Sequence, residues 1–531
     1  MGCHARGYEQ RCKPAHKGGR PRGRGDMKLS KTNYLVYRDC AHNAWMKVHR
    51  PDAYAAQPLS VFDQAIIETG NDVDVRARAL FPGGVLIRRG DAAGTAELVA
   101  ARTSVLYQPV FETERYTTAC DILAWNDALQ AYDLFEVKAS TSGDDRRAKD
   151  DLYAHDIAFQ ALVLEACGVP LGRLHLVRLN GAYVSDGTLD IAQLFTREDF
   201  TERANALFEA VRAEMDAAHD VISLAEMPPA PCACIYKGRS SQCTTFATIN
   251  PGVPEYSVHD LTRIGASPKK LRALVDDGIL DIREVPASFE LTVPQRHQVE
   301  AVQRRQPYVD LDPLGAFLAD IRYPVAFLDY ETYPCALPRF ARYSPYNHVP
   351  FQFSLHTVEV PGAAPVHREF LFTEKGCPDQ PFVDALVAAL PAEGSIIAWN
   401  KPFEKGINAK LAERLPAEAA RLEAINARFI DLMDVFSEQM VVHPRFRGKT
   451  SIKWVLPALV PKLSYKALAI QEGATASEAW NAIVTGELEP DLSDEARRNL
   501  LAYCGLDSLA MVEIWRALID IQAAREIREA G

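Results

Sequence analysis

The chain has 531 residues, of which 48% are hydrophobic and 24% are charged, and its formal net charge at pH 7 is −11. A chain of this length is too long for one hydrophobic core, so we expect two or three domains. The negative net charge argues against a protein that coats nucleic acid indiscriminately. It is compatible with a nuclease, because carboxylates that bind metal count as acidic and local basic grooves can hold the nucleic-acid backbone. No apolar run approaches the roughly 20 residues of a membrane span and no signal peptide is visible, so we expect a cytoplasmic protein without a membrane partner.

Residues 1–26 are rich in Arg, Lys and Gly and show no hydrophobic periodicity. This composition favours a disordered basic tail, or a true start at Met27, over an arm that binds nucleic acid. The prediction of function therefore uses only the sequence after this segment.

Residues 120–125 and 132–138 are predicted to pair as a β-hairpin across a short turn. Glu136 and Lys138 then share a face of the second strand, and Asp121 meets them across the sheet. Two carboxylates and a lysine are suited to holding a divalent cation and to stabilising the charge on a pentacovalent phosphate. A surface hairpin of alternating charge is the alternative interpretation.

Three cysteines, Cys232, Cys234 and Cys243, form a compact group after a proline-rich stretch, and a fourth, Cys40, lies far upstream. The eleven cysteines of the chain do not resemble a secreted disulfide framework, so we expect mostly reduced thiols with some metal ligands. Four thiolates suit either zinc or a [4Fe-4S] cluster, although a C-x-C step is unusual for a structural zinc site. Spacing alone therefore predicts a metal without choosing between these two.

The segment from Asp260 to Ile282 resembles a helix-hairpin-helix element, whose backbone amides grip DNA phosphates. A plain helical linker is the alternative. Neither interpretation assigns chemistry to a particular side chain in this segment.

Asp329 and Glu331 end an apolar strand that begins after Pro324, and side chains two apart on a strand point to the same face. Tyr503 and Asp507 stand one turn apart in a segment whose apolar residues recur at helical spacing. Such a helix delivers a third carboxylate and a phenol to the strand carboxylates. Oxygen ligands of this kind hold the Mg²⁺ or Mn²⁺ ions of a two-metal phosphodiesterase, so the pattern predicts a nuclease.

A basic segment between these motifs interleaves cations with aromatic rings, as a groove for single-stranded nucleic acid does. Its candidate nucleic-acid-binding residues are Arg445, Arg447, Lys449 and Lys453, with Phe446 and Trp454 among them. A solvated basic loop would have the same sequence pattern.

The first half resembles RecB-type PD-(D/E)XK nucleases that carry an iron–sulfur cluster, in which one cysteine precedes the nuclease core and three follow it. The four cysteines Cys40, Cys232, Cys234 and Cys243 match that order, which implies cluster ligation. The resemblance implies catalytic or metal-binding roles for Asp121, Glu136 and Lys138, and Gln160 matches the Gln of the family's next helix motif. Two positions depart from the family: Leu164 stands where Tyr is common, and no clear His appears near Asp72–Asp74.

The second half resembles DnaQ-like, RNase H-fold exonucleases of the DEDD class. Asp329 and Glu331 match the first motif, and Tyr503 with Asp507 match the third in its Tyr-bearing form. Glu404, after a strand end, occupies the place of the usual Asp of the middle motif. Asp431 and Asp434 are further candidates for metal ligation.

The whole arrangement resembles a bacterial family catalogued as domain of unknown function 2779. We expect an α/β protein with a disordered tail (1–26), a PD-(D/E)XK restriction-endonuclease-like domain with the cysteine cluster (27–250), a helical connector (251–319) and an RNase H-like mixed-sheet exonuclease domain (320–525). The expected function is metal-dependent hydrolysis of DNA or RNA, with single strands or ends favoured, by a 3'-5' exonuclease. Mg²⁺ or Mn²⁺ and a [4Fe-4S] cluster, or zinc in its place, are the expected cofactors. A nucleic-acid-binding module in which one or both nuclease sites have decayed, with a structural iron–sulfur cluster, is the alternative.

Overall fold

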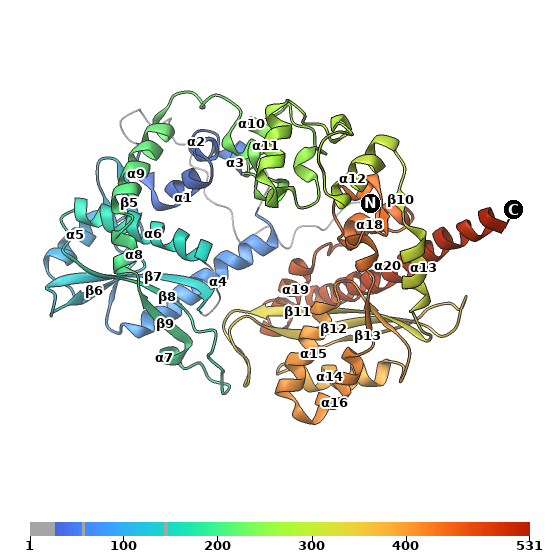
Figure 1. The fold of residues 1–531 in the computed structure, drawn as a ribbon. Coiled ribbons are helices and arrows are strands. Elements are labelled where there is room, and N and C mark those ends of the chain that lie inside the picture. The colour runs from blue at the N-terminus through green and yellow to red at the C-terminus, as the bar shows by residue number, and fades with distance from the viewer. Residues whose placement is uncertain (1–26, 56–58, 143–146, 531) are drawn as a thin grey trace.

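The computed structural model describes residues 27–55, 59–142 and 147–530, so the predicted basic tail lies outside the described residues. The fold is mixed α/β, as expected, with one large sheet in each half of the chain. Figure 1 shows these two halves side by side, with a mainly helical segment between them in sequence. We call the elements from β1 to α10 the first unit, the elements from β11 to α20 the second unit, and the segment between them the connector.

The first unit is built on a six-stranded sheet of order β2-β3-β6-β7-β8-β9. Its strands are β2 (Val85–Leu86), β3 (Val105–Tyr107), β6 (Ile122–Asn126), β7 (Ala131–Thr141), β8 (Leu171–Leu179) and β9 (Phe195–Asp199). A small sheet contains β1 (Leu29–Ser30), β4 (Val110–Glu112) and β5 (Tyr116–Ala119). Strands β6 and β7 are antiparallel, which confirms the predicted hairpin. Seven consecutive buried residues begin β7, as expected for a central strand covered on both faces.

Helices pack around this sheet and bury its apolar side chains. They are α1 (Lys31–Asp39), α2 (Ala41–His49), α3 (Pro51–Tyr54), α4 (Val61–Ala77), α5 (Ala92–Ala100), α6 (Arg147–Ala166), α7 (Ile191–Leu194), α8 (Thr201–Asn205), α9 (Phe208–Ser223) and α10 (Phe246–Ile249). Helix α4 begins at a capping box in which Ser60 and Asp63 satisfy each other's backbone N–H groups. The Ser30 side chain accepts a hydrogen bond from the backbone N–H of Asn33 and so fixes where α1 begins.

The connector contains α11 (Pro268–Asp276), α12 (Val293–Arg304) and α13 (Leu311–Ala319), together with the short strand β10 (Tyr308–Val309). Between Asp260 and Ile282, α11 is the one α-helix of this described stretch, and the chain before it forms short 3-10 turns. The prediction of two helices around a hairpin is therefore wrong for the first helix. Arg263, in the left-handed conformation, and Pro268 restrict helix formation to the residues that follow.

The second unit is built on a five-stranded sheet of order β13-β12-β11-β14-β15. Its strands are β11 (Val325–Cys335), β12 (Asn347–Val358), β13 (Val366–Leu371), β14 (Ile396–Ala398) and β15 (Phe429–Asp431). The strand β16 (Val441–Val442) pairs with β10 of the connector. Strand β12 is antiparallel to both β11 and β13, whereas β14 and β15 continue the sheet in parallel with β11.

Two layers of helices cover this sheet. The helices are α14 (Asp379–Ala389), α15 (Pro402–Arg414), α16 (Ala419–Asn426), α17 (Asp434–Ser437), α18 (Ile452–Leu459), α19 (Gly473–Thr485) and α20 (Pro490–Ala530). Side chains of β11 alternate between two cores, because Phe327 packs with α20 and Leu328 packs with α14 and α15. The predicted late helix is confirmed as α20, which is buried at Cys504, Met511 and Trp515. No described helix has the length and apolar character that crossing a membrane requires.

Candidate functional sites

Three carboxylates of the second unit lie together where β11 passes α20. Asp329 and Glu331 project from β11 on the face that also carries Phe327, and Asp507 projects from α20. One oxygen of each carboxylate lies within 4.8 Å of an oxygen of the other two. Glu331 and Asp507 are buried and Asp329 is half-buried. The structure thus brings together three of the residues that the sequence predicts as metal ligands, and we call them the carboxylate trio.

Burial and mutual repulsion make the carboxylate trio difficult to ionise fully. Loss of solvation, followed by the charges of Asp507 and Glu331, raises the pKa of Asp329 well above its usual range. Burial and the charge of Asp507 do the same to the pKa of Glu331. Burial also raises the pKa of Asp507, to about 6. A divalent cation between these oxygens would remove the repulsion, so the donor set fits Mg²⁺ or Mn²⁺.

Glu404 lies beside the carboxylate trio, in the first turn of α15. Its side chain is buried, and its Oε2 atom has no hydrogen-bond partner among the described residues. Burial raises the pKa of Glu404 to about 8, and its charge raises the pKa of both Asp329 and Glu331. A buried carboxylate oxygen without a partner costs free energy unless a cation or water satisfies it. Glu404 therefore suits the fourth ligand position, which stays a prediction.

Asp431 holds the backbone turn that precedes α15. Its carboxylate accepts hydrogen bonds from the backbone N–H groups of Asn400 and Lys401, both at 2.8 Å, and of Met433 at 3.1 Å. Asn400 has a φ of 74°, in the left-handed region. These bonds fix the turn from β14 into α15 and with it the position of Glu404. The role of Asp431 seen here is to position backbone, and Asp434 instead forms an ion pair with Lys401 at 3.6 Å.

We expect Asp431→Ala to destabilise the protein by about 2–4 kcal/mol, because three backbone N–H groups lose a charged acceptor in a buried place. Thermal unfolding measures this effect. Asp434→Ala is the matched control: its ion pair is long and partly exposed, so its loss should cost less than about 0.5 kcal/mol. Equal melting temperatures for the two variants would contradict the positioning role.

Two phenols and a lysine surround Asp507. Tyr503 is buried in the core that α20 forms with the sheet, and burial, followed by the charge of Asp507, raises the pKa of its phenol. Tyr465, which follows α18, donates a short hydrogen bond to Asp507 Oδ1. Lys453 of α18 lies 5.8 Å from the centre of the Tyr503 ring, and its charge opposes the rise in the pKa of Glu331. Tyr465 was not predicted from the sequence.

The basic segment forms a turn next to α18. Its rings and cations do interleave, since Lys449 lies 4.3 Å and Arg447 lies 5.6 Å from the centre of the Trp454 ring. Arg447 also forms an ion pair with Glu255 of the connector at 2.6 Å. Arg445 is exposed. Of the four predicted nucleic-acid contacts, Lys453 is the one that the structure places near the carboxylate trio.

The first unit has a second cluster of charged groups, centred on Glu136 of β7. Lys138 Nζ lies 2.6 Å and Lys31 Nζ lies 2.9 Å from Glu136 Oε1, and Gln160 donates to Oε2 at 2.7 Å. Lys138 also binds Asp156 at 2.7 Å. The lysines, together with the bond from Gln160, hold the pKa of Glu136 below its usual value despite the opposing effect of burial.

Asp121 stands next to this cluster at the start of β6. Its Oδ2 accepts a hydrogen bond from the backbone N–H of Val137 at 2.8 Å, and Gln108 donates to its Oδ1 at 3.3 Å. The same Gln108 amide donates to Asp74 of α4, also at 3.3 Å. Burial, followed by the charge of Glu136, raises the pKa of Asp121 to about 7. The structure places Asp121, Glu136, Lys138 and Gln160 together, and their catalytic roles stay a prediction.

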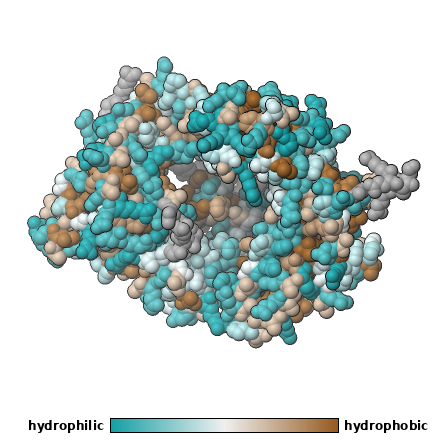
Figure 2. Space-filling view, viewed as in Figure 1, coloured by the Kyte–Doolittle hydropathy of each residue, from teal (hydrophilic) through white to brown (hydrophobic). Residues whose placement is uncertain are grey.

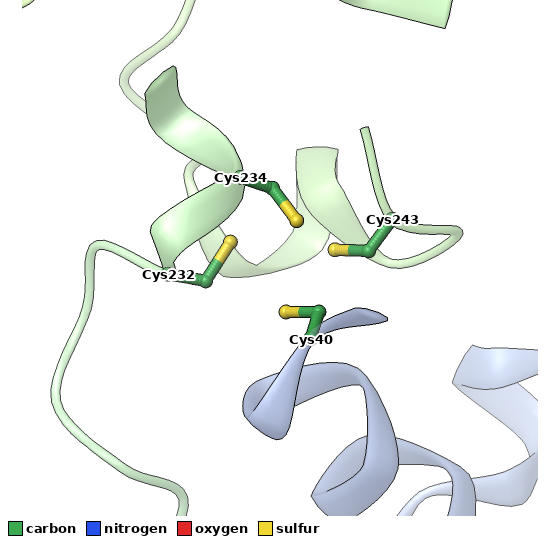
Figure 3. Close-up of side chains that lie close together, drawn as sticks. All are labelled: Cys40, Cys232, Cys234 and Cys243. Atoms are coloured by element: carbon green, nitrogen blue, oxygen red, sulfur yellow. The ribbon is translucent and has the colours of Figure 1, made fainter. Parts of the chain in front are cut away.

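The four predicted cysteines converge, although Cys40 and Cys243 are far apart in sequence. Their sulfur atoms lie within 4.8 Å of one another, all four residues are buried, and Figure 3 shows the sulfurs pointing toward a common centre. Asn250 donates to Cys232 Sγ at 3.4 Å. Tetrahedral zinc, with Zn–S of about 2.3 Å, would set sulfur separations of about 3.8 Å, whereas a [4Fe-4S] cluster holds its thiolates further apart. The donor set therefore fits a metal centre held by four thiolates.

Three residues of the first-unit cluster were missed from the sequence: Lys31, Asp74 and Asp156. A signal existed for Asp156, because it precedes Gln160 by one helical turn and therefore shares its face. Lys31 and Asp74 lie on helices that reach β7 from distant parts of the chain, so no local spacing relates them to Glu136.

Comparison with known proteins gives limited matches. The model of the family described as domain of unknown function (DUF2779) matches residues 326–451, which include Asp329, Glu331 and Glu404. A protein of Mycoplasma pneumoniae, described as the uncharacterized MG366 homolog, is 26% identical over 206 residues; the match covers 35% of this chain and about a third, 31%, of that protein. A phage-related exonuclease from Haemophilus somnus is 14% identical over 34% of this chain and 92% of its own, with a TM-score of 0.17. That score supports no argument about fold or function.

Proposed function

We propose that this protein is a metal-dependent nuclease that hydrolyses phosphodiester bonds of DNA or RNA, with its main active site at the carboxylate trio. The observation that carries the proposal is that carboxylate oxygens of Asp329, Glu331 and Asp507 lie within 4.8 Å of one another. Beside them lies Glu404, whose buried Oε2 has no hydrogen-bond partner among the described residues. Carboxylates arranged in this way are suited to holding Mg²⁺ or Mn²⁺.

Bound divalent cations would supply an activated water and stabilise the leaving oxygen. The residues of the chain would then have separate tasks. The trio and Glu404 bind and space the ions, and Tyr465 orients the carboxylate of Asp507. Burial, followed by the charge of Asp507, raises the pKa of Tyr503, so its phenol stays protonated at neutral pH and can only orient the attacking water. Lys453 offers a positive charge to the phosphate.

The sheet of the second unit supports an RNase H-like exonuclease domain. Three antiparallel strands continue into two parallel ones, and the first strand, β11, lies at the centre with its carboxylates facing α20. We further propose the PD-(D/E)XK interpretation for the first unit and cluster ligation by Cys40, Cys232, Cys234 and Cys243. A 3'-5' direction of cleavage is part of the same proposal.

A nucleic-acid-binding role is the second candidate for the first unit, and one observation favours it. Lys31 and Lys138 both form ion pairs with Glu136 and with Asp156. A cation at Glu136 would have to displace at least one of these lysines. The carboxylate trio and Glu404, by contrast, have no ion pair with a lysine or arginine among the described residues, which is why we assign the main activity there.

Nuclease assays on labelled single- and double-stranded DNA and RNA, with Mg²⁺, Mn²⁺ or EDTA, test the proposal. We expect hydrolysis that requires the divalent cation and prefers single strands or ends. Intact substrates under all these conditions, with folded protein, would contradict the assignment and favour the binding role.

The variant Tyr503→Phe distinguishes a catalytic role of the phenol from a packing role of the ring, because it removes only the hydroxyl. A role in orienting water predicts a fall in turnover of about tenfold or more with metal affinity preserved. Tyr465→Phe is the comparison: it removes a hydrogen bond to a metal ligand, so we expect metal affinity to fall by about 10-fold or more. Metal titrations of turnover measure both effects. Unchanged turnover of Tyr503→Phe at saturating metal would leave Tyr503 a packing role alone.

A further inference from the structure

A cavity of about 890 Å³ lies between the two units. Helices α4 and α6 and strand β7 line it from the first unit, and β11, α15 and α19 line it from the second. Figure 2 shows the molecular surface hollowed between the two halves. Lys138 of the first-unit cluster and Glu331 of the carboxylate trio both line this cavity. The two candidate centres therefore open onto one shared space.

Direct contacts hold the two units around the cavity. The backbone N–H of Arg342 donates to Ser185 O at 2.7 Å, and the N–H of Ser185 donates to Tyr343 O at 2.9 Å. Tyr346 donates to the carbonyl of Ala139 at 2.5 Å. Ala336 of the second unit packs within an apolar core of the first. Paired backbone groups and a shared core fix the relative position of the two centres.

The cavity wall combines apolar surface, aromatic rings and lysines. Phe62 and Ile66 of α4 are 53% and 54% exposed, although large apolar side chains usually avoid water when they are clustered. The ring of Phe403 lines the opposite side, and Lys138 and Lys149 supply positive charge. Grooves for single-stranded nucleic acid combine these features, because bases stack on apolar and aromatic surfaces while cations hold the phosphates.

We propose that a single-stranded segment of nucleic acid occupies this cavity and contacts both centres at once. Its bases lie against Phe62, Ile66 and Phe403, and its phosphates lie near Lys138 on one side and the carboxylate trio on the other. A cavity of this volume is in the range of about 300–1,000 Å³ that takes ligands of drug size, so it accepts a few nucleotides of one strand and not a duplex. The inference rests on the proposed nuclease function.

Two neighbouring positions of α4 give a matched test. Ile66 lines the cavity, whereas Ile67 is similarly exposed, at 49%, and is not among the lining residues. We expect Ile66→Glu to weaken binding of a fluorescein-labelled oligothymidylate of about 12 nucleotides by about fivefold or more, and Ile67→Glu to change it less than about twofold. Fluorescence anisotropy measures the affinity, in protein that also carries Asp329→Ala and Glu136→Gln so that the strand stays intact. Equal affinities of the two Glu variants would overturn the proposal.

Photo-crosslinking provides a second measurement. A strand with a single 5-iodouracil at successive positions should crosslink to peptides of both units, including those with Phe62 and Phe403. Crosslinks confined to one unit would overturn the shared cavity, while hydrolysis in the unsubstituted protein would still support the proposed function. Crosslinks to both units in a protein that never hydrolyses would keep the shared cavity and reject the nuclease. Phe62→Ala, an exposed truncation, serves in place of Ile66→Glu if the latter does not fold.

Discussion

Asp329→Ala is expected to abolish most divalent-dependent hydrolysis, with a fall of more than about 100-fold. Removing a residue that only supports a metal ligand lowers metal affinity or activity by about 10–100-fold. Asp329 is itself a proposed ligand, with a carboxylate oxygen within 4.8 Å of oxygens of Glu331 and Asp507, so we expect a larger loss. Rates on a labelled single strand, with Mg²⁺ or Mn²⁺ at saturation, measure the effect.

Stability measurements control for misfolding of this variant. Because the folded protein raises the pKa of Asp329 above its unfolded value, its ionised form disfavours folding at neutral pH. In EDTA, Asp329→Ala should therefore have a melting temperature equal to or higher than that of the unsubstituted protein. Added Mg²⁺ should stabilise Asp329→Ala less than it stabilises the unsubstituted protein.

Glu136→Gln in the first unit is the comparison and should retain most of the hydrolysis. Near-normal activity of Asp329→Ala, with loss of activity in Glu136→Gln, would move the chemistry to Asp121, Glu136 and Lys138.

The second large effect is expected at the cysteines. If they hold a [4Fe-4S] cluster, anaerobically purified protein should be brown, absorb near about 400 nm and contain about four irons per chain. Colourless protein with one zinc per chain would reject the iron–sulfur cluster while keeping the metal centre. Protein with neither metal would reject the centre itself.

Cys40→Ser should lower the stability of the first unit by about 3 kcal/mol or more, which corresponds to about 6–12 °C in melting temperature. Among the four cysteines, Cys40 is the one that links the beginning of this unit to its end, because the other three follow the sheet in sequence. Cys167→Ser is the matched control, because Cys167 is exposed in the same unit, and it should change stability by less than about 0.5 kcal/mol. Similar melting temperatures for the two variants would contradict a metal centre that ties the unit together.

Local spacing in the sequence determined the parts of each candidate site that lie on one element. Asp329 and Glu331 share a face because side chains alternate along a strand, and Tyr503 and Asp507 share a face because a helix repeats every 3.6 residues. The hairpin that carries Asp121 and Glu136 followed from strand pattern and turn residues in the same way. Of the two helices that the helix-hairpin-helix resemblance implies, the first did not form, because the left-handed backbone at Arg263 and Pro268 restrict the helix to residues 268–276.

Tertiary structure alone decided which distant elements meet. Lys31 and Asp74 come to Glu136 and Asp121 because α1 packs against α6 and α9 while α4 packs on β7, and no periodicity encodes such contacts. The same holds for Asp431, which the sequence offered as a metal ligand and which the fold uses to hold the turn before Glu404. The shared cavity depends on how the two units pack. Such contacts arise from the burial of surfaces far apart in the chain, so residue spacing carries no record of them.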